Sequence, residues 1–302
     1  FDRMYLLSIF FLICAGQVFS EDNDNVTSYT PRGIYLPFTH TNLKLQDPII
    51  RKDLILGLKI INGHEAKVGQ FPYLVGLGIF LKHRSFFCGG TLIGPTTILT
   101  AAHCVQGAED IKVFLGFFNI MEFEEPGSYV TFVGPANIKS HPQYNGSVYY
   151  NDIAIIQLDE VIQLSDTIQT IALPKQAVTV DNSSAFVISG WGKIKDNSQP
   201  ITDKKHYYSI YGQDYSSCSA YYKTEASYDT YSNHICTNGA GGVGPCRGDS
   251  GGPLVQVNSD GSSTMVGLIS LGIGSCEVGA PSLYTDMSKF RDWVIANSDY
   301  TD

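Results

Sequence analysis

The stretch Gly248-Asp249-Ser250-Gly251-Gly252-Pro253 places one serine between glycines, directly after an acid. A serine hydroxyl is a poor nucleophile at neutral pH, so it needs a base to take its proton and donors to hold the resulting oxyanion. Glycines let the backbone approach a ligand closely, which would leave Oγ of Ser250 uncovered and the amides of Gly248 and Ser250 aimed at a substrate oxygen. The alternative is a glycine-rich surface turn, and a base with an orienting acid elsewhere in the chain would decide between the two.

Candidates for the base and the acid lie upstream, in the chain order histidine, aspartate, serine. Leu99-Thr100-Ala101-Ala102-His103-Cys104 sets a histidine among small residues, and Asn151-Asp152-Ile153-Ala154-Ile155-Ile156 sets an aspartate at the head of an apolar run. Taken singly, His103 is typical of a core histidine and Asp152 of a cap at a strand start. Together with the serine stretch they favour nucleophilic catalysis.

These motifs give the chain its resemblance to the chymotrypsin-fold serine endopeptidases, over roughly residues 60–297. The resemblance implies an all-β fold of two six-stranded antiparallel β-barrels, with the active site in the cleft between them and a C-terminal helix. It implies that Ser250 attacks a peptide carbonyl, that His103 acts as general base and then general acid, and that Asp152 holds the imidazole. The amides of Gly248 and Ser250 are the expected oxyanion hole.

Composition supports a β-rich globular chain. The 302 residues are 43% hydrophobic and 16% charged, which is typical of a chain with a large core. Phe290, Trp293, Val294 and Asn297 recur at helical spacing and predict an amphipathic C-terminal helix. Strand-like runs separated by turns rich in Gly, Pro, Asn and Ser span residues 73–81, 91–99, 111–115, 129–133, 153–158, 185–189, 254–257 and 265–270.

The N-terminal part is predicted to be removed in two steps. Residues 1–20 are interpreted as a secretory signal peptide, because residues 5–19 are mostly apolar but too short to span a bilayer; Phe1-Asp2-Arg3 precedes Met4 and is expected to be extraneous. Residues 21–59 are interpreted as a propeptide and residues 60–302 as the serine protease domain.

Activation is expected at the bond between Lys59 and Ile60, where the basic residue suits a trypsin-like activating protease. The resemblance implies that the new α-amino group of Ile60 pairs with Asp249 and thereby shapes the oxyanion hole. A buried carboxylate needs such a positive partner.

Cysteine usage indicates an oxidising compartment. Cys14 falls in the leader, and the remaining six cysteines allow fifteen pairings. The resemblance selects Cys88–Cys104, Cys218–Cys236 and Cys246–Cys276. Asn25, Asn145 and Asn182 each begin a sequence that fits the N-glycosylation pattern. The pattern alone does not decide whether the protein is a glycoprotein.

Neither a cofactor nor a metal is expected. The chain has no zinc-type CxxC pair, and Phe117 stands where the family's calcium loop has an acid. We interpret Glu122, Glu124 and Glu125 as a solvated acidic face. Eight tyrosines between positions 207 and 231 belong either to a surface loop or to the rim of the substrate pocket.

The resemblance also locates the substrate pocket. It places the pocket base at Gly244 and the other key positions at Gly272 and Ser282, with Ser270 as a hydrogen-bond donor to Asp152. Without an anion at the base, a buried substrate ammonium would go uncompensated, whereas an apolar side chain gains about 25 cal/mol per Å² buried. The sequence therefore predicts chymotrypsin-like cleavage after Phe, Tyr or Leu, with an elastase-like preference for small residues as the alternative.

Three classes of function compete: an active endopeptidase, a catalytically inactive homologue that serves as a binding module, and an enzyme acting on another acyl substrate such as an ester. The ordered motifs favour the endopeptidase. Its expected partners are protein or peptide substrates, an activating trypsin-like protease and protein protease inhibitors. The net charge of −9 argues against nucleic acid and anionic membranes. We expect a secreted, extracellular monomer, with digestion in a gut lumen as one role.

Overall fold

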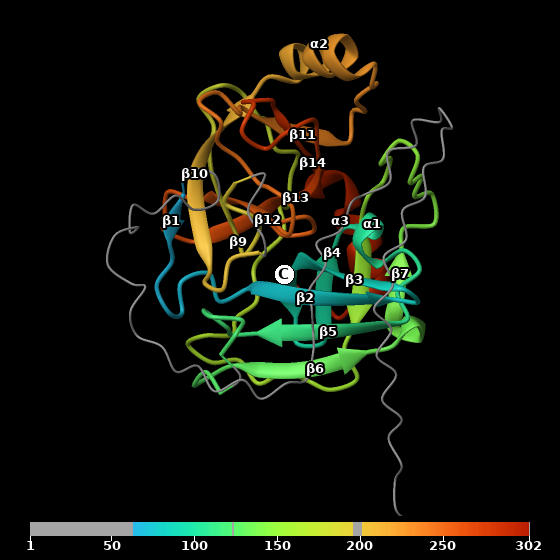
Figure 1. Cartoon of the computed structure of the whole chain (residues 1–302), viewed down its shortest axis with the longest axis vertical. Coiled ribbons are helices and arrows are strands. Elements are labelled where there is room, and N and C mark those ends of the chain that lie inside the picture. The colour runs from blue at the N-terminus through green and yellow to red at the C-terminus, as the bar shows by residue number, and fades with distance from the viewer. Residues whose placement is uncertain (1–62, 123, 196–200, 302) are drawn as a thin grey trace, which may run out of the picture. The chain divides into compact units, whose positions relative to one another are not determined.

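The computed structural model describes residues 63–122, 124–195 and 201–301. The predicted signal peptide, the propeptide and the bond between Lys59 and Ile60 lie outside these residues. Two antiparallel seven-stranded sheets make up the fold (Figure 1). The all-β prediction is confirmed.

The first sheet has the strand order β6-β5-β2-β3-β4-β8-β7. It is curled but open, because among the described residues its two end strands, β6 and β7, are not paired with each other. Its strands are β2 (Leu74–Leu81), β3 (Arg84–Gly94), β4 (Thr97–Thr100), β5 (Asp110–Leu115), β6 (Tyr129–Val133), β7 (Ile138–Ser140) and β8 (Ala154–Gln157). The predicted run 91–99 is therefore two strands, joined by a turn at Pro95 and Thr96, with Thr91 paired to Leu99.

The second sheet has the order β1-β10-β11-β14-β13-β12-β9, and an additional pairing between β9 and β10 closes six of its strands into a barrel. Its strands are β1 (His64–Glu65), β9 (Ala185–Gly190), β10 (His206–Gln213), β11 (His234–Thr237), β12 (Pro253–Val257), β13 (Ser263–Gly272) and β14 (Ser282–Asp286).

Apolar packing joins the two sheets. Side chains of β2, β4 and β8 form one core cluster, and Val255, Met265 and Leu268 of the second sheet belong to the same cluster. Burial of this apolar area is the main stabilising term of the fold. The two sheets are thereby held against one another, and the candidate catalytic residues lie in segments that follow or precede their strands.

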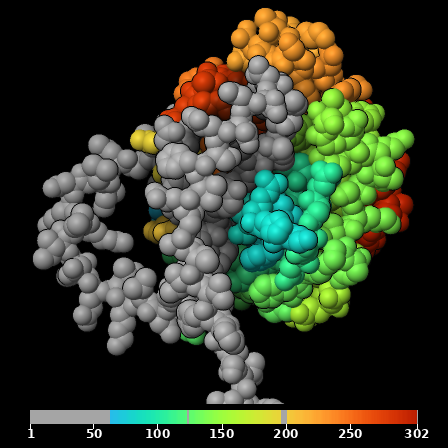
Figure 2. Space-filling model, turned by 45° about the vertical axis from the view of Figure 1, so that its right-hand side comes forward, coloured from blue at the N-terminus to red at the C-terminus, as the bar shows by residue number. Residues whose placement is uncertain are grey.

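In the described part of the chain, three helices accompany the sheets: α1 (Ala102–Val105), α2 (Tyr215–Ala226) and α3 (Met287–Asn297), with a short 3₁₀ helix at Pro135–Asn137. The predicted C-terminal helix is α3; Asp286 caps it by accepting a 2.9 Å hydrogen bond from Ser288 N, and Phe290 and Val294 are buried. The atoms of α2, in orange, lie at the surface in Figure 2. None of the helices in the described ranges has the length and apolar character needed to cross a bilayer.

Among the described residues, three disulfides are formed, one in the first half of the fold and two in the second: Cys88–Cys104 between β3 and α1, Cys218–Cys236 between α2 and β11, and Cys246–Cys276 between two loops of the second sheet. These are the pairs that the family resemblance implies. Disulfides of this kind form in oxidising compartments.

Candidate active site

His103 and Asp152 come together because two adjacent strands end side by side. β4 pairs with β8, with Thr100 opposite Ala154; His103 follows β4 in α1, and Asp152 closely precedes β8. Nδ1 of His103 lies 2.7 Å from Oδ2 of Asp152, and the His103 backbone amide donates to Oδ1 at 2.9 Å. The carboxylate therefore fixes both the ring and the backbone of the histidine.

Asp152 is fully buried but ionised. Burial raises its pKa, yet the charge of His103 and the hydrogen bonds from His103 and Ser270 outweigh burial and hold the pKa below the ordinary value. Ser270 Oγ, on β13, donates to Oδ2 at 2.6 Å. The second sheet thus supplies the contact to Asp152 that was expected of Ser270.

Ser250 lies in the loop before β12, and this loop packs against the first sheet. Gly89 N donates to the Ser250 carbonyl at 2.8 Å. Gly251 has φ +79°, and a Cβ there would lie 2.3 Å from Thr100 Oγ1. Only glycine fits this close approach, which explains the residue that follows the serine.

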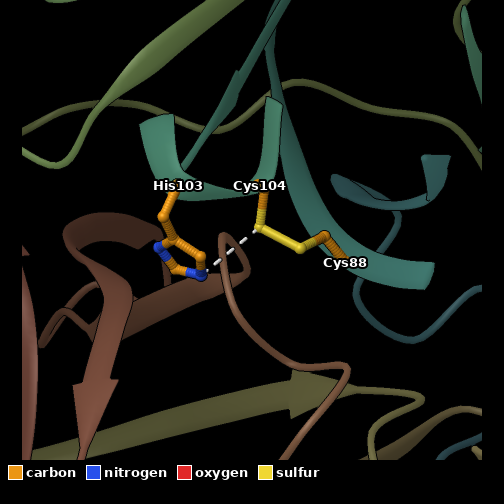
Figure 3. A group of neighbouring side chains, drawn as sticks. All are labelled: Cys88, His103 and Cys104. Carbon is orange, nitrogen blue, oxygen red and sulfur yellow. Dashed lines mark hydrogen bonds between the residues drawn. A yellow bond between two sulfur atoms is a disulfide. The ribbon is translucent and has the colours of Figure 1, made fainter. Parts of the chain in front are cut away.

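The disulfide Cys88–Cys104 lies beside both the imidazole of His103 and the loop that carries Ser250. Figure 3 draws the contact between Cys104 Sγ and His103 Nε2 as a dashed line. The two atoms are 3.7 Å apart, and Cys104 Sγ also lies 3.5 Å from the Ser250 carbonyl oxygen. Among the described residues, no hydrogen bond joins the Ser250 hydroxyl to His103. Catalytic hydrogen bonds are often long in the absence of substrate and shorten when it binds.

The same three residues, Cys88, His103 and Cys104, bring sulfur and nitrogen atoms within 4.8 Å of one another. Metal binding by cysteine requires the thiolate, and both sulfurs are joined in the disulfide. With that disulfide intact, this cluster offers a metal ion only one imidazole nitrogen.

The backbone around Ser250 leaves two amides available. In the described part of the chain, neither Gly248 N nor Ser250 N donates a backbone hydrogen bond, whereas the amide of Asp249 between them donates to Cys246 O at 2.9 Å. Gly248 has φ +105°, a conformation that favours glycine. Two such amides, one on the candidate nucleophile itself and one two residues before it, suit binding of an oxyanion.

Asp249 turns away from Ser250 into the second sheet and is 2% exposed. Its carboxylate accepts hydrogen bonds from Gly192 N at 2.8 Å and Cys246 N at 3.0 Å. Burial raises its pKa to about 6, against the lowering by these two amides. Within the described ranges it forms no ion pair, so the buried acid lacks a positive partner there.

The motif Gly190-Trp191-Gly192 makes the space for that carboxylate. A Cβ on Gly190 would lie 2.0 Å from Oδ1 of Asp249, and one on Gly192 would lie 2.3 Å from Oδ2. Trp191 between them is fully buried, and its Nε1 donates to Phe118 O at 3.1 Å. Nothing in the local sequence indicated this role of Gly190 and Gly192.

The three expected pocket residues lie together. Gly272 on β13 is paired with Ser282 on β14, and a Cβ on Gly244 would lie 3.3 Å from Ser282 Oγ. A Cβ on Gly272 would meet nothing within 4 Å. The three residues thus form a small, uncharged wall with open space in front of Gly272.

The prediction that Glu122, Glu124 and Glu125 form a solvated acidic face is wrong for Glu125, which is buried. Glu122 and Glu124 are exposed, but Glu125 is only 9% exposed. Its carboxylate accepts hydrogen bonds from Phe118 N at 2.9 Å and Asn119 N at 2.7 Å. Glu125 therefore links the two ends of its loop by hydrogen bonds to the backbone at Phe118 and Asn119. The sequence alone does not indicate this contact.

Tyr149 is a candidate site residue that the motifs did not indicate. Its ring packs edge-on against the imidazole of His103, with centroids 5.5 Å apart. Its only sequence signal is its position three residues before Asp152. The tyrosines of the 207–231 cluster divide: Tyr222 is fully buried, and Tyr211 is 59% exposed.

Comparisons with known proteins identify the relatives of this chain. The Trypsin family model matches residues 60–294. Brachyurin from Leptuca pugilator is 36% identical over 236 residues, covering 78% of this chain and 96% of its own length. Chymotrypsin-C from Bos taurus is 33% identical over 245 residues, covering 79% of this chain and 88% of its own.

The solved structure of HL collagenase has the same fold, with a TM-score of 0.66 at 34% identity, covering 79% of this chain and 98% of its own. The family match spans most of the chain, and the two relatives are each more than 30% identical over most of their length. The chain therefore belongs to the trypsin family and is a serine endopeptidase.

Proposed function

We propose that Ser250 is the nucleophile, His103 the general base and acid, and Asp152 the residue that holds the imidazole. The observation that carries this proposal is the buried carboxylate of Asp152, bonded at once to His103 and Ser270. An anion at Nδ1 fixes the tautomer that leaves Nε2 free to take the serine proton, and it stabilises the imidazolium that results. The amides of Gly248 and Ser250 hold the oxyanion.

The same proposal is tested by labelling. A fluorophosphonate should modify Ser250 in the processed enzyme, and Ser250→Ala should leave the fold intact while removing nearly all peptide cleavage. An unlabelled, inactive wild type would favour the inactive homologue that serves as a binding module. Ester cleavage without peptide cleavage would favour the other acyl substrate.

We further infer that the chain is made as a zymogen. Asp249 is buried with a raised pKa and, in the described residues, no positive partner. Cleavage after Lys59 by a trypsin-like protease would release the α-amino group of Ile60, whose charge offsets the burial of the carboxylate. Before that cleavage the protein is secreted as an inactive extracellular precursor, in keeping with its three disulfides.

For the substrate, we propose cleavage after Phe, Tyr or Leu. Gly244, Gly272 and Ser282 offer no anion to a substrate Lys or Arg, and the open space at Gly272 admits a large side chain. A peptide panel that varies only the residue before the cut tests this. A preference for Ala over Phe would instead support the elastase-like alternative, and a preference for Lys or Arg would contradict both.

A further inference from the structure

The segment 148–152, which leads into β8 and ends in Asp152, has a strained backbone. Tyr149 has φ +47° and Asn151 has φ +55°. Asparagine is enriched in this left-handed region, but tyrosine is not. Strained residues of this kind persist only where the surroundings determine their conformation, and they cluster at functional sites. The question is which residues hold this segment.

Side chains from the second half of the fold contact all five residues of the segment, each a different one. Tyr228 Oη donates to Val148 O at 2.5 Å, His234 faces the Tyr149 carbonyl, the rings of Tyr231 and Tyr150 lie 4.9 Å apart, Asn233 Nδ2 donates to Asn151 Oδ1 at 2.9 Å, and Thr285 Oγ1 donates to Asp152 O at 2.9 Å.

Two of these contacts reach the two strained residues, and both come from the start of β11. Asn233 is 9% exposed and His234 is 6% exposed. The backbone around them is itself fixed: Asp286 N donates to Asn233 O at 2.8 Å, and His234 pairs with Thr285 across β11 and β14. The two side chains therefore project from a hydrogen-bonded backbone at the start of β11, an interior strand of the second sheet.

The tautomer of His234 follows from its neighbours. Its Nδ1 accepts a 3.2 Å hydrogen bond from Tyr231 N, so the ring proton resides on Nε2 and can be donated to the Tyr149 carbonyl. Burial lowers the pKa of His234 to about 4, and the ring is neutral in this role. Asn233 donates instead to the side chain of Asn151, and Nδ2 of Asn151 in turn donates to Gln143 O at 3.2 Å, so the Asn151 side chain is held on both sides.

What the segment holds is the catalytic pair. Tyr149 packs against the ring of His103, and Asp152 bonds to Nδ1 of the same ring. We propose that Asn233 and His234 are positioning residues, which lock Tyr149 and Asn151 in their left-handed conformations and so fix Asp152 and His103 from the opposite sheet. This inference rests on the catalytic roles proposed above.

The experiment compares His234→Leu, His234→Gln and Asn233→Ala in the processed enzyme, each normalised by active-site titration with a fluorophosphonate. Normalisation removes any loss that comes from misfolded protein. His234→Leu should lower kcat per titrated site by about tenfold or more with KM little changed, because the defect lies in the catalytic pair. His234→Gln retains an amide donor and should recover most of that loss.

A pH profile and a stability control complete the test. The acid limb of kcat/KM should move to lower pH in His234→Leu, because a displaced carboxylate stabilises the imidazolium less. Phe186→Leu, in the apolar core of the second barrel, lowers stability without touching the segment and should leave kcat per site and the pH profile unchanged. If His234→Leu does not fold, Tyr228→Phe removes only the hydroxyl bonded to Val148 and should give a smaller loss of the same kind.

The outcomes separate this inference from the function it rests on. A wild type that neither cleaves peptides nor reacts with the fluorophosphonate contradicts the proposed catalytic roles. An active wild type whose His234 and Asn233 variants keep kcat within about twofold per titrated site, or lose no more than Phe186→Leu, contradicts the positioning role alone.

Discussion

The carboxylate of Asp249 occupies the space where a side chain at position 192 would begin: a Cβ on Gly192 would lie 2.3 Å from Oδ2, and Gly192 N donates to Oδ1 at 2.8 Å. Asp249 immediately precedes Ser250, so we expect a shift of this carboxylate to disturb the serine loop. The carboxylate can occupy this position only because glycine stands at position 192, as it does at position 190.

Gly192→Ala should push Asp249 out of its site and lower kcat/KM by about 100-fold, the loss expected when a hydrogen-bond donor to the oxyanion is misplaced. Gly134→Ala is the matched control, since a Cβ there meets nothing within 4 Å and its φ is −80°. Steady-state kinetics with one peptide substrate measure both. Equal activities of the two variants would show that the carboxylate can move without consequence.

Activation should depend on Lys59. Trypsin should switch on the wild-type precursor, and N-terminal sequencing of the active chain should begin at Ile60. Lys59→Gln should stay inactive under the same treatment. A Lys59→Gln precursor that becomes fully active with a different N-terminus would contradict the pairing of Ile60 with Asp249.

The uncleaved chain should lose stability as the pH rises from about 4 to about 6. Burial raises the pKa of Asp249 to about 6, above its ordinary value of 3.8. The folded state thus favours the protonated acid, and its contribution to the unfolding free energy is complete below pH 3.8 and lost through pH 6. The loss amounts to about 3 kcal/mol.

Urea denaturation of the uncleaved Ser250→Ala chain measures this loss. Adding Asp249→Asn, which replaces the acid by an amide that cannot ionise, should abolish it. In the cleaved Ser250→Ala chain the Ile60 amine should offset it. If the precursor with Asp249 and the precursor with the Asp249→Asn substitution show the same pH dependence, burial of this acid does not oppose its ionisation.

The buried amine of Lys205 predicts the opposite trend, a rise of the unfolding free energy with pH. Lys205 is 1% exposed, with Nζ 5.3 Å from the centroid of the Trp191 ring and 3.4 Å from Phe71 O. Burial lowers its pKa to about 8, against the opposing charge of Glu125. Because the unfolded chain then binds more protons, the unfolding free energy should rise between pH 8 and 10.5.

Lys205→Met should remove that rise, which is about 3 kcal/mol in full, and should itself be tolerated because a buried charge is replaced by an apolar chain of similar length. Lys204→Met is the control: Lys204 is exposed and pairs with Glu65 at 3.1 Å. The midpoint of urea denaturation at several pH values gives the answer. A rise that survives in Lys205→Met must come from another group.

The sequence-based strand predictions succeed where short apolar or β-branched runs are bounded by turn residues. The run 129–133 coincides with β6 (Tyr129–Val133), and 185–189 lies within β9 (Ala185–Gly190). Residues 206–226 hold β10 and α2, which were not predicted, because tyrosine and serine are compatible with strand, helix and loop. Asp214, which caps α2 by accepting from Ser217 N at 2.9 Å, was the available signal.

The site divides in the same way. His103, Asp152 and Ser250 stand in motifs that can be read locally, because each needs its immediate neighbours. The contact of Tyr149 with His103, the hydrogen bond of Asn233 to Asn151 and the burial of Glu125 depend on residues brought together only by folding. No local pattern encodes such contacts, so the single sequence could not predict them.

The substrate pocket gives the last prediction. A Cβ on Gly272 projects into open space, and Gly272 is paired with Ser282, so Gly272→Val should fill the pocket without disturbing the strand. The ratio of kcat/KM for Phe over Ala before the cut should then fall by about 100-fold, since a filled apolar pocket discriminates by size. Gly272→Ala, which adds only one carbon, should give a ratio between that of the wild type and that of Gly272→Val. The peptide panel used for the wild type measures all three enzymes. An unchanged ratio in Gly272→Val would mean that the substrate side chain binds elsewhere.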